Sequence, residues 1–516
     1  MTPTTLPRST PSAQNVDAAG ISAFVHALET TAGVEPHSIM LLRHGQVVAE
    51  GWWAPYSADR AHLLYSLSKS FTSSAVGFAV AEGLMGLNDT VLGHFPELDA
   101  EVTDPRSRSM RVRHVLAMAS GHRAETLDRA LAVDPVDVVR GFLLTPPDDE
   151  PGTVFAYNQP CTFAAGAIVQ RVTGQSLSEY LRPRLLDPLG IGAVGWQRDE
   201  SGRELGFSGL HATTHAIAAL GQLYLQQGEW DGTQLLPREW VAEATRSHVS
   251  NAGESNPDWA QGYGFQFWMA RHGYRGDGAY GQFAVVLPEH DVVLALTGQS
   301  LDMQAVLDAA WAHLLPAFGT DAARIGDAAA DDSLATRLAD LTLPGVAGPT
   351  EHDAAPVRPA AEEARVGDQH SPGTERLVSF TAADGNDQPG LSVVELRASA
   401  DAATTLTLVE GDSRLVARVE AEDWVVTDGS DDGSVDGSGE IVGVGVGVGV
   451  GDGPAAAPVA ASATRSADLL HVDLVFVETP HRLHLTLDEA DATFTALWET
   501  QPLHAPRLAE LRMPRD

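Results

Sequence analysis

The chain has almost no cysteine and comparatively few positive charges. One residue, Cys161, is the only cysteine among 516 residues, which excludes an intramolecular disulfide and a zinc site built from several thiolates. The 33 basic residues are outnumbered by 69 acidic ones, so the net charge is −36. Because such a chain repels phosphate backbones and anionic lipid surfaces, we expect neither a nucleic-acid nor a membrane partner.

Long apolar runs are also missing. No stretch approaches the ~18 consecutive apolar residues of a transmembrane helix. Residues 1–17 are polar and rich in Thr, Ser and Pro, and they lack the charged start and apolar run of a signal peptide. We therefore expect a cytoplasmic protein whose residues 1–17 form a flexible tail.

Alternating helix and strand patterns extend over residues 18–318. A helix is predicted by four apolar residues at i, i+3, i+4, i+7 spacing: Ile21, Phe24, Val25 and Leu28. A hairpin is predicted over residues 38–50 with its turn at His44-Gly45, and two adjacent strands are predicted within residues 282–297. Strands at both ends with helices between them predict an α/β (α+β) sandwich with an antiparallel sheet.

The remainder of the chain differs in composition. Residues 319–372 are rich in Ala, Asp, Pro and Glu and predict a linker, with a short helix possible at Ser333–Leu341. Residues 373–516 contain strand-like segments and predict a small all-β C-terminal domain. Residues 428–463 interrupt it with Gly-Val repeats and predict a disordered insertion, because such repeats lose much backbone entropy on folding.

Lysine occurs once among the 33 basic residues, as Lys69; all the others are arginine. Lysine can lose its proton inside a protein, whereas arginine effectively cannot. The one position that keeps lysine is therefore a candidate for proton-transfer chemistry.

A serine stands three residues before this lysine. If a helix begins at Ser66, the side chains of Ser66 and Lys69 share one face and can form a hydrogen bond. The apolar residues that follow predict a buried helix, and burial would lower the pKa of Lys69 and give an amine able to accept the Ser66 proton. A plain helix N-cap is the alternative interpretation of Ser66, and Ser68 and Ser70 are alternative nucleophiles by proximity.

The stretch Ser66-Leu-Ser-Lys-Ser-Phe-Thr resembles the first motif of the β-lactamase-related serine hydrolases. That family includes class C β-lactamases, D-Ala-D-Ala carboxypeptidases and family VIII esterases. Further segments resemble the family in its own order: Gly86-Leu-Asn-Asp-Thr-Val, Val112-Arg-His-Val-Leu-Ala-Met-Ala-Ser-Gly, Pro151-Gly-Thr-Val-Phe-Ala-Tyr-Asn and Asp187-Pro-Leu-Gly-Ile. The resemblance covers residues 20–315 and implies a β-lactamase/transpeptidase-like antiparallel sheet flanked by helices, with a helical lobe.

The resemblance also implies roles for particular residues. In the family's second motif, Tyr-x-Asn, Tyr157 would be a second proton-moving group. Asn158 and Gln159 would bind substrate, although Gln159 replaces the usual asparagine. The third motif, Lys-Thr-Gly or His-Thr-Gly, corresponds to the substrate-binding segment Gly276-Asp277-Gly278, which lacks the cation.

Two neighbouring residues, His272 and Arg275, are candidates to replace that cation in space. The resemblance further places an oxyanion hole at the backbone N–H groups of Ser66 and Ala279. Loss of the cation favours an esterase or amidase over an efficient β-lactamase.

Together, these residues predict a serine hydrolase acting on a small ester or amide through an acyl-enzyme. Ser66, Lys69 and Tyr157 would be catalytic, with no metal and no cofactor. Two alternatives stay open: a catalytically weak or inactive penicillin-binding-like protein, and a D-amino-acid peptidase or carboxypeptidase.

Overall fold

The computed structural model describes residues 6–319, 328–346, 376–398, 404–421, 423–428, 457–503 and 507–515. The chain divides into two compact units, residues 1–341 with 513–516, and residues 342–512. The division falls inside the predicted linker. In the described part of the chain, no helix is both long and apolar enough to cross a membrane.

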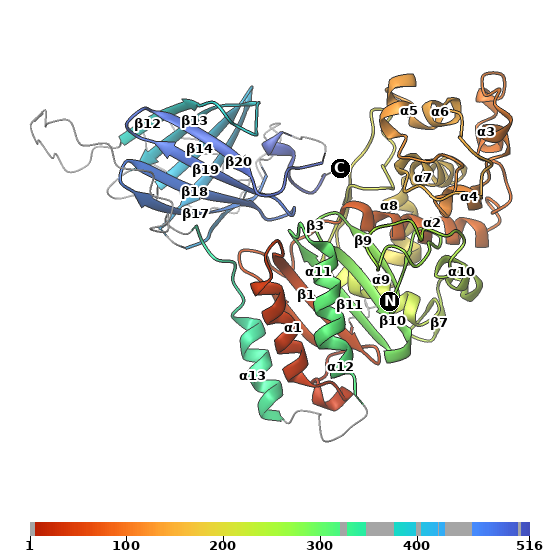
Figure 1. Cartoon of the computed structure of the whole chain (residues 1–516), viewed down its shortest axis with the longest axis horizontal. Helices are drawn as coiled ribbons and strands as arrows, with labels where there is room; N and C mark the ends of the chain where they lie inside the picture. Colours follow the sequence, from red (N-terminus) through yellow and green to blue (C-terminus); the bar gives the residue numbers. More distant parts are fainter. Residues whose placement is uncertain are drawn as a thin grey trace, which may run out of the picture. The chain divides into compact units, whose positions relative to one another are not determined.

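A six-stranded antiparallel sheet forms the centre of the first unit (Figure 1), in the order β2-β1-β11-β10-β9-β8. Its strands are β1 (Pro36–Arg43), β2 (Gln46–Trp52), β8 (Trp268–Ala270), β9 (Gly273–Gly278), β10 (Gln282–Leu287) and β11 (Val292–Gly298). The predicted hairpin is β1–β2, turning at His44 and Gly45, which both have positive φ. The predicted strand pair is β10–β11. Since helices cover both faces, β1 is buried along its whole length.

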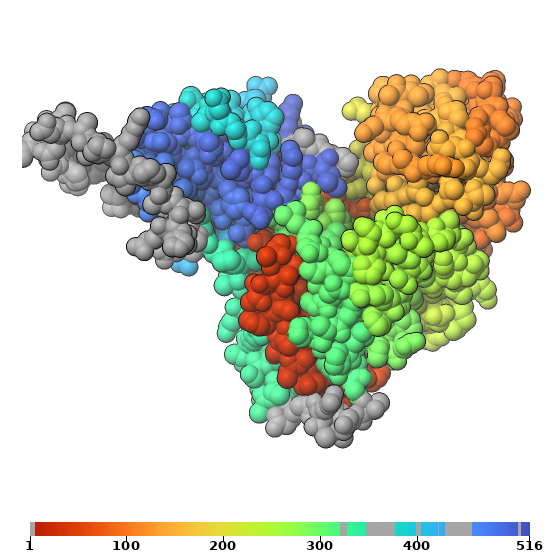
Figure 2. All heavy atoms as spheres, in the orientation of Figure 1, coloured from red at the N-terminus to blue at the C-terminus, as the bar shows by residue number. Residues whose placement is uncertain are grey.

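The helix predicted after Gly20 lies on one face of this sheet. It is α1 (Ala18–Thr30), whose buried residues include all four at the predicted spacing. Its first turn is capped by the Asp17 side chain, which accepts a hydrogen bond from the Ala19 N–H at 2.9 Å. Figure 2 shows α1, in red, between α11 (Met303–Ala309) and α13 (Ala328–Ala339).

The other face carries α9 (Thr214–Leu225) and the helix that follows the predicted nucleophile, α2 (Ser68–Ala81). Gly221 allows α9 to approach the sheet closely, because a Cβ there would lie 2.6 Å from a methyl group of Val293 on β11. The predicted buried helix after Ser66 is thus present, and 12 of the 14 residues of α2 are buried.

A helical lobe packs beside α2 and shares its apolar core. Its longest helix, α7 (Gln159–Thr173), packs on α2 and ends at Gly174, which has the left-handed φ of a helix C-terminus. The other short helices of the unit are α3 (Pro105–Ser109), α4 (Val112–Leu116), α5 (Leu127–Val133), α6 (Val138–Leu144), α8 (Leu177–Leu181), α10 (Arg238–Ala244) and α12 (Leu315–Ala317). An antiparallel sheet covered by helices on both faces, with a helical lobe beside it, is the predicted β-lactamase/transpeptidase-like fold.

Short elements connect these layers. The 3₁₀ and π turns of the first unit are η1 (Ser12–Gln14), η2 (Tyr65–Leu67), η3 (Leu92–His94), η4 (Pro96–Leu98), η5 (Arg182–Leu186), η6 (Pro288–His290) and η7 (Ala310–Leu314). Two small sheets consist of β3 (His62–Leu63) with β5 (Leu210–Ala212) and β4 (Gly195–Trp196), and of β6 (Glu229–Trp230) with β7 (Thr233–Gln234).

The N-terminal segment differs from the predicted flexible tail over residues 6–17. Leu6 and Val16 are buried, and Arg8 forms a parallel bridge with Val47 at the edge of β2. Ser12 donates a hydrogen bond to the buried carboxylate of Asp331 on α13. These contacts hold the segment on the sheet, and they also fix α13, which occupies part of the predicted linker.

The second unit is all-β, as predicted, and forms a nine-stranded sheet in the order β15-β14-β13-β12-β20-β19-β18-β17-β16. β12 and β20 pair in parallel, and the other neighbours pair antiparallel. The strands are β12 (Arg376–Ala382), β13 (Leu391–Ala398), β14 (Thr404–Glu410), β15 (Ser413–Val419), β16 (Val425–Thr427), β17 (Val459–Ser466), β18 (Leu469–Phe476), β19 (Arg482–Asp488) and β20 (Thr493–Trp498). A 3₁₀ turn, η8 (Leu508–Glu510), follows.

The two ends of this nine-stranded sheet approach each other. The Arg418 N–H on β15 donates to the Thr427 hydroxyl on β16 at 2.8 Å, and the Ala463 N–H on β17 donates to the Glu420 carbonyl at 3.1 Å. The predicted insertion over residues 428–463 lies mostly outside the described residues. The predicted end of the insertion, residue 463, is wrong, because β17 already begins at Val459. The alternate residues Val459, Ala461 and Ala463 are buried in the core of the second unit.

Candidate active site

Ser66 lies in the short turn η2, immediately before α2. It is partly exposed, while residues 61–65 and 67–70 around it are buried. The preceding residue, Tyr65, has a φ of +46°, a region that non-glycine residues rarely adopt. The sharp turn therefore presents one serine hydroxyl to solvent from an otherwise buried segment.

The Lys69 amine lies one helical turn further along the chain. Its Nζ is 3.0 Å from Ser66 Oγ, 2.6 Å from Gln159 Oε1 and 2.8 Å from the Phe207 carbonyl oxygen. Lys69 is only 2% exposed, and this burial lowers its pKa to about 7, against the opposing influence of Glu125 and Asp277. When neutral, the amine can donate its two protons to Gln159 and Phe207, which leaves its lone pair directed at Ser66.

Tyr157 completes a group of three around Ser66. Its ring centroid lies 4.7 Å from Lys69 Nζ, and its hydroxyl interacts with the Ser66 side chain. Burial, together with the negative charge of Asp277, raises the pKa of Tyr157 well above its ordinary value. The phenol is therefore protonated at neutral pH and can donate a proton.

The two residues after Tyr157 face different partners. Gln159 begins α7 and reaches Lys69, so its extra methylene does not remove the contact with the lysine. Asn158 is fully buried and accepts hydrogen bonds at Oδ1 from the Thr126 N–H at 3.0 Å and the Thr126 hydroxyl at 2.9 Å. Of these two residues, Gln159 is the one that touches the Ser66–Lys69 pair.

The third-motif segment on β9 packs directly against η2 and the start of α2. A Cβ on Gly276 would lie 2.5 Å from both Ser70 Oγ and Leu67 Cδ1, and a Cβ on Gly278 would lie 2.1 Å from the Leu64 carbonyl oxygen. These two glycines are thus needed for close packing. A cationic side chain at position 276 has no room, which gives a physical reason for its absence here.

The Asp277 carboxylate, between those glycines, is paired with a buried arginine. Arg275 Nε donates to Asp277 Oδ2 at 3.0 Å, and the exposed fractions of the two residues are 0% and 7%. The other candidate cation, His272, is exposed and packs against Trp311 at a ring distance of 4.9 Å. Of the two residues predicted as replacements, only Arg275 is buried next to the site.

The backbone N–H groups of Ser66 and Ala279, predicted to form an oxyanion hole, belong to η2 and to the residue after β9, two segments that pack together. Within the described ranges, neither the Ser66 N–H nor the Ala279 N–H donates a hydrogen bond to another backbone or side-chain group. Close packing of Gly278 on η2 brings the end of β9, and with it Ala279, beside the nucleophile turn. The rings of Tyr65 and Tyr280, each one residue removed from these N–H groups, meet edge to face at 5.6 Å.

The alternative nucleophiles have other partners. Ser68 Oγ donates to the Tyr65 carbonyl at 2.6 Å, and Ser70 Oγ donates to the Gln266 carbonyl at 3.0 Å. Both residues are fully buried. Among the three serines of this segment, only Ser66 contacts the lysine amine.

Comparison with known proteins identifies the family of the chain. The beta-lactamase family profile matches residues 22–318, more than half of the chain. The chain belongs to the beta-lactamase family. The match lies within the first unit, and the all-β unit lies outside it.

Two of the curated relatives are named as a hydrolase and an esterase. The chain is 28% identical over 286 residues to 6-aminohexanoate-dimer hydrolase of Paenarthrobacter ureafaciens, covering 50% of this chain and 71% of that protein. It is 30% identical over 159 residues to lovastatin esterase of Penicillium rubens, covering 27% of this chain and 40% of that protein. A solved penicillin-binding-protein homologue from Caulobacter crescentus is 18% identical, with a TM-score of 0.46 over 60% of this chain and 99% of that one.

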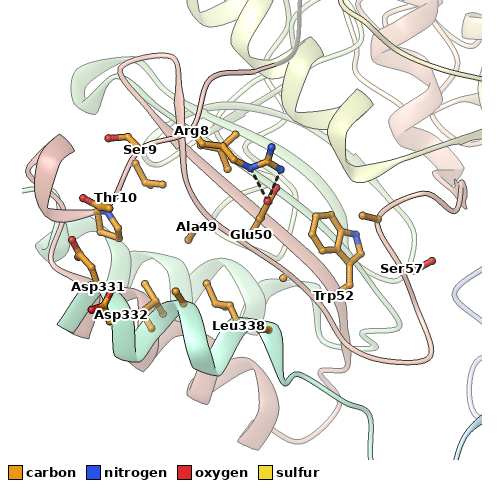
Figure 3. Close-up of a pocket in the computed structure, with 18 of the residues that line it drawn as sticks. Arg8, Ser9, Thr10, Ala49, Glu50, Trp52, Ser57, Asp331, Asp332 and Leu338 are labelled. Atoms are coloured by element: carbon orange, nitrogen blue, oxygen red, sulfur yellow. Dashed lines mark hydrogen bonds and ion pairs between the residues drawn. The ribbon is translucent and has the colours of Figure 1, made fainter. Parts of the chain in front are cut away.

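The beta-lactamase-family unit also contains a hollow away from Ser66 (Figure 3). It has a volume of about 590 Å³ and lies between the N-terminal segment, β2 and α13. Arg8 and Glu50 form an ion pair on its wall, and Leu338 and Trp52 line it. Because β2 and β9 are near opposite edges of the sheet, this hollow is separate from the site at Ser66.

Several groups that contact the site were not predicted. The Phe207 carbonyl is a backbone group, so no side-chain motif marks it. Glu125 accepts the Gln159 N–H at 3.0 Å at the start of α7, and only the three-dimensional fold brings these residues together.

The described residues contain no group of three His, Cys, Asp or Glu side chains arranged to hold a metal ion.

Proposed function

We propose that this chain is a serine hydrolase that cleaves a small ester or amide through an acyl-enzyme on Ser66. The observation that carries the proposal is the Lys69 amine, 3.0 Å from Ser66 Oγ and held by the Gln159 and Phe207 oxygens. An amine with a pKa of about 7 has a substantial neutral fraction at neutral pH, which a general base requires.

Acylation would begin when neutral Lys69 accepts the Ser66 proton and Ser66 Oγ attacks the carbonyl carbon. The N–H groups of Ser66 and Ala279 would stabilise the negative oxygen of the tetrahedral intermediate. Tyr157 would donate its proton to the leaving alcohol or amine as the carbonyl re-forms, and would regain a proton from Lys69. This leaves an ester on Ser66 and both proton-moving groups in their starting states.

Deacylation would use the same groups in reverse. A water molecule gives a proton to the Lys69–Tyr157 pair and attacks the acyl carbon, and the proton returns to Ser66 Oγ as the acid product leaves. The names of the curated relatives, a dimer hydrolase and an esterase, support ester or amide cleavage as the reaction class. The packed Gly276 supports a substrate that does not need a third-motif cation.

Hydrolysis of paired 4-nitrophenyl esters and 4-nitroanilides of short acyl chains tests the proposal. Wild-type protein should release nitrophenol with saturation kinetics, and Ser66→Ala should reduce kcat by roughly 10³-fold or more. Binding of these compounds without turnover by folded wild-type protein would instead favour the inactive penicillin-binding-like alternative. Comparison with a chromogenic β-lactam should show much lower kcat/KM for the lactam.

A further inference from the structure

A buried ion pair between Arg275 and Asp277 lies next to Trp268, whose ring stacks on Tyr157. Arg275 is fully buried, with Nε bonded to Asp277 and Nη1 bonded to the Asp258 carbonyl at 2.7 Å. Its guanidinium also lies 4.2 Å from the ring centroid of Trp259. The desolvation cost of burying two charges often cancels their mutual attraction, so a buried ion pair contributes little net stability. The Arg275–Asp277 pair is therefore a candidate for a role other than stabilising the fold.

The strand register connects that pair to Tyr157. Arg275 on β9 is the direct cross-strand partner of Trp268 on β8. The Trp268 ring stacks on the Tyr157 ring, with centroids 5.2 Å apart and planes 22° apart. The guanidinium carbon lies 5.9 Å from the Trp268 centroid, and the indole N–H interacts with the Asp277 carboxylate.

A further aromatic ring, that of Tyr263, packs edge to face against both Trp268 and Tyr157. Tyr263 meets Trp268 at 4.8 Å with the planes 89° apart, and it also meets Tyr157 edge to face at 6.2 Å. Trp268 is thus held by the ion pair at its polar edge and by Tyr263 at its ring. Phe155 and Trp259 also meet this ring edge to face, at 5.6 Å and 6.4 Å, and Tyr157 is stacked on it.

We propose that Arg275 and Asp277 are positioning residues for Tyr157, acting through Trp268; this inference rests on the proposed function. The ion pair fixes the indole, and the indole holds the phenol ring against Lys69 and Ser66. Arg275, one residue before Gly276, thereby helps to position Tyr157. Position 276 itself has no room for a cationic side chain. Asp277 acts in the same assembly and does not bind substrate.

The physical requirement is orientation. A proton-moving phenol must keep its oxygen within hydrogen-bond reach of both the nucleophile and the leaving group. A side chain with two free torsions is held in one orientation only if its ring packs on a fixed neighbour. A loose Trp268 would therefore lower the rate of the chemical steps more than it would weaken substrate binding.

Four variants of the full chain separate these contributions. Arg275→Met with Asp277→Leu removes both charges together and so leaves no unpaired buried ion. Trp268→Leu removes the ring face, and Trp268→Phe keeps a ring but loses the N–H. Arg275→Lys keeps the charge but loses the fork that bonds Asp277 and Asp258 simultaneously.

Steady-state kinetics on the aryl ester is the readout, with folding checked by thermal unfolding and near-ultraviolet circular dichroism. We expect kcat to fall by about 10- to 100-fold in Trp268→Leu and in the double variant, with KM changed by less than about threefold. Trp268→Phe and Arg275→Lys should lose about three- to tenfold in kcat, between those variants and wild type. The matched control, Asp473→Asn, alters the buried Arg482–Asp473 ion pair of the second unit, and should leave kcat unchanged.

Folded variants with kcat within about twofold of wild type would overturn the inference. If Trp268→Leu and the double variant do not fold, unchanged kcat in both Arg275→Lys and Trp268→Phe overturns it. The failure of the proposed function has a different signature, since wild-type protein itself would then show neither turnover nor modification of Ser66. That result would overturn both proposals.

Discussion

Gln159 Oε1 lies 2.6 Å from Lys69 Nζ, so a glutamine fills the place next to the lysine where related proteins are expected to have asparagine. The backbone N–H of Gln159 is bonded to the Glu125 carboxylate at 3.0 Å, which fixes the start of α7. The longer side chain therefore retains the contact that directs the lysine lone pair toward Ser66.

Gln159 should influence the protonation of Lys69 in either direction. Gln159→Leu removes an acceptor that stabilises the ammonium form, so the pKa of Lys69 should fall below about 7. Gln159→Glu adds a negative charge at nearly the same volume, so that pKa should rise. The acidic limb of the kcat/KM profile should therefore move to lower pH in the leucine variant and to higher pH in the glutamate variant; shifts in the same direction would contradict the assignment.

Wild-type activity should depend on pH in a manner set by Lys69. Under the proposed mechanism the active form is the neutral amine, and burial lowers the pKa of Lys69 to about 7. Below that pH, kcat/KM should drop by about tenfold per unit, and above it kcat/KM should level off. Because the pKa of Tyr157 is raised, the phenol should cause no alkaline decline up to pH 9; a profile that is flat between pH 5 and pH 9 would refute Lys69 as the base.

Replacing the lysine by arginine isolates proton transfer from charge. Lys69→Arg keeps the positive charge but cannot accept a proton at neutral pH. We expect kcat/KM for the aryl ester to fall by roughly 10²- to 10⁴-fold. Activity close to wild type in a folded Lys69→Arg protein would show that Ser66 is activated by another group.

The packing of Gly276 predicts a cost in stability. A methyl group at this position would meet Ser70 Oγ and Leu67 Cδ1 at 2.5 Å, and Ser70 is already bonded to the Gln266 carbonyl. Gly276→Ala should therefore lower the free energy of unfolding by about 1–3 kcal/mol, measured by urea denaturation. Gly192, where a Cβ would meet nothing within 4 Å, is the control, and Gly192→Ala should change stability little. Equal effects of the two substitutions would show that Gly276 is not needed for close packing.

Local patterns in the sequence were sufficient for much of the fold. The spacing of apolar residues predicted α1, and the paired runs around residues 282–297 predicted β10 and β11, because these patterns depend on neighbouring residues alone. The closeness of Ser66 and Lys69 also follows from a three-residue separation at the start of a helix. The structure places Lys69 Nζ next to Ser66 Oγ for that reason.

Contacts between distant segments could not be predicted in the same way. The N-terminal segment pairs with β2 at Arg8 and buries two isolated apolar residues, Leu6 and Val16, which form no periodic pattern. The partnership of Trp268 with Arg275 depends on the register of a short edge strand. Composition alone placed the end of the Gly-rich insertion too late, since β17 begins with small apolar residues at Val459.

Covalent labelling of the nucleophile is the most direct test of the mechanism. Full-length protein is incubated with a fluorophosphonate, and its intact mass and peptide masses are measured, with Ser66→Ala in parallel. The account predicts one adduct per chain, located on Ser66, and no adduct in the alanine variant. Folded wild-type protein that forms no adduct, or forms it on Ser68 or Ser70 instead, would contradict the assignment of Ser66 as the nucleophile.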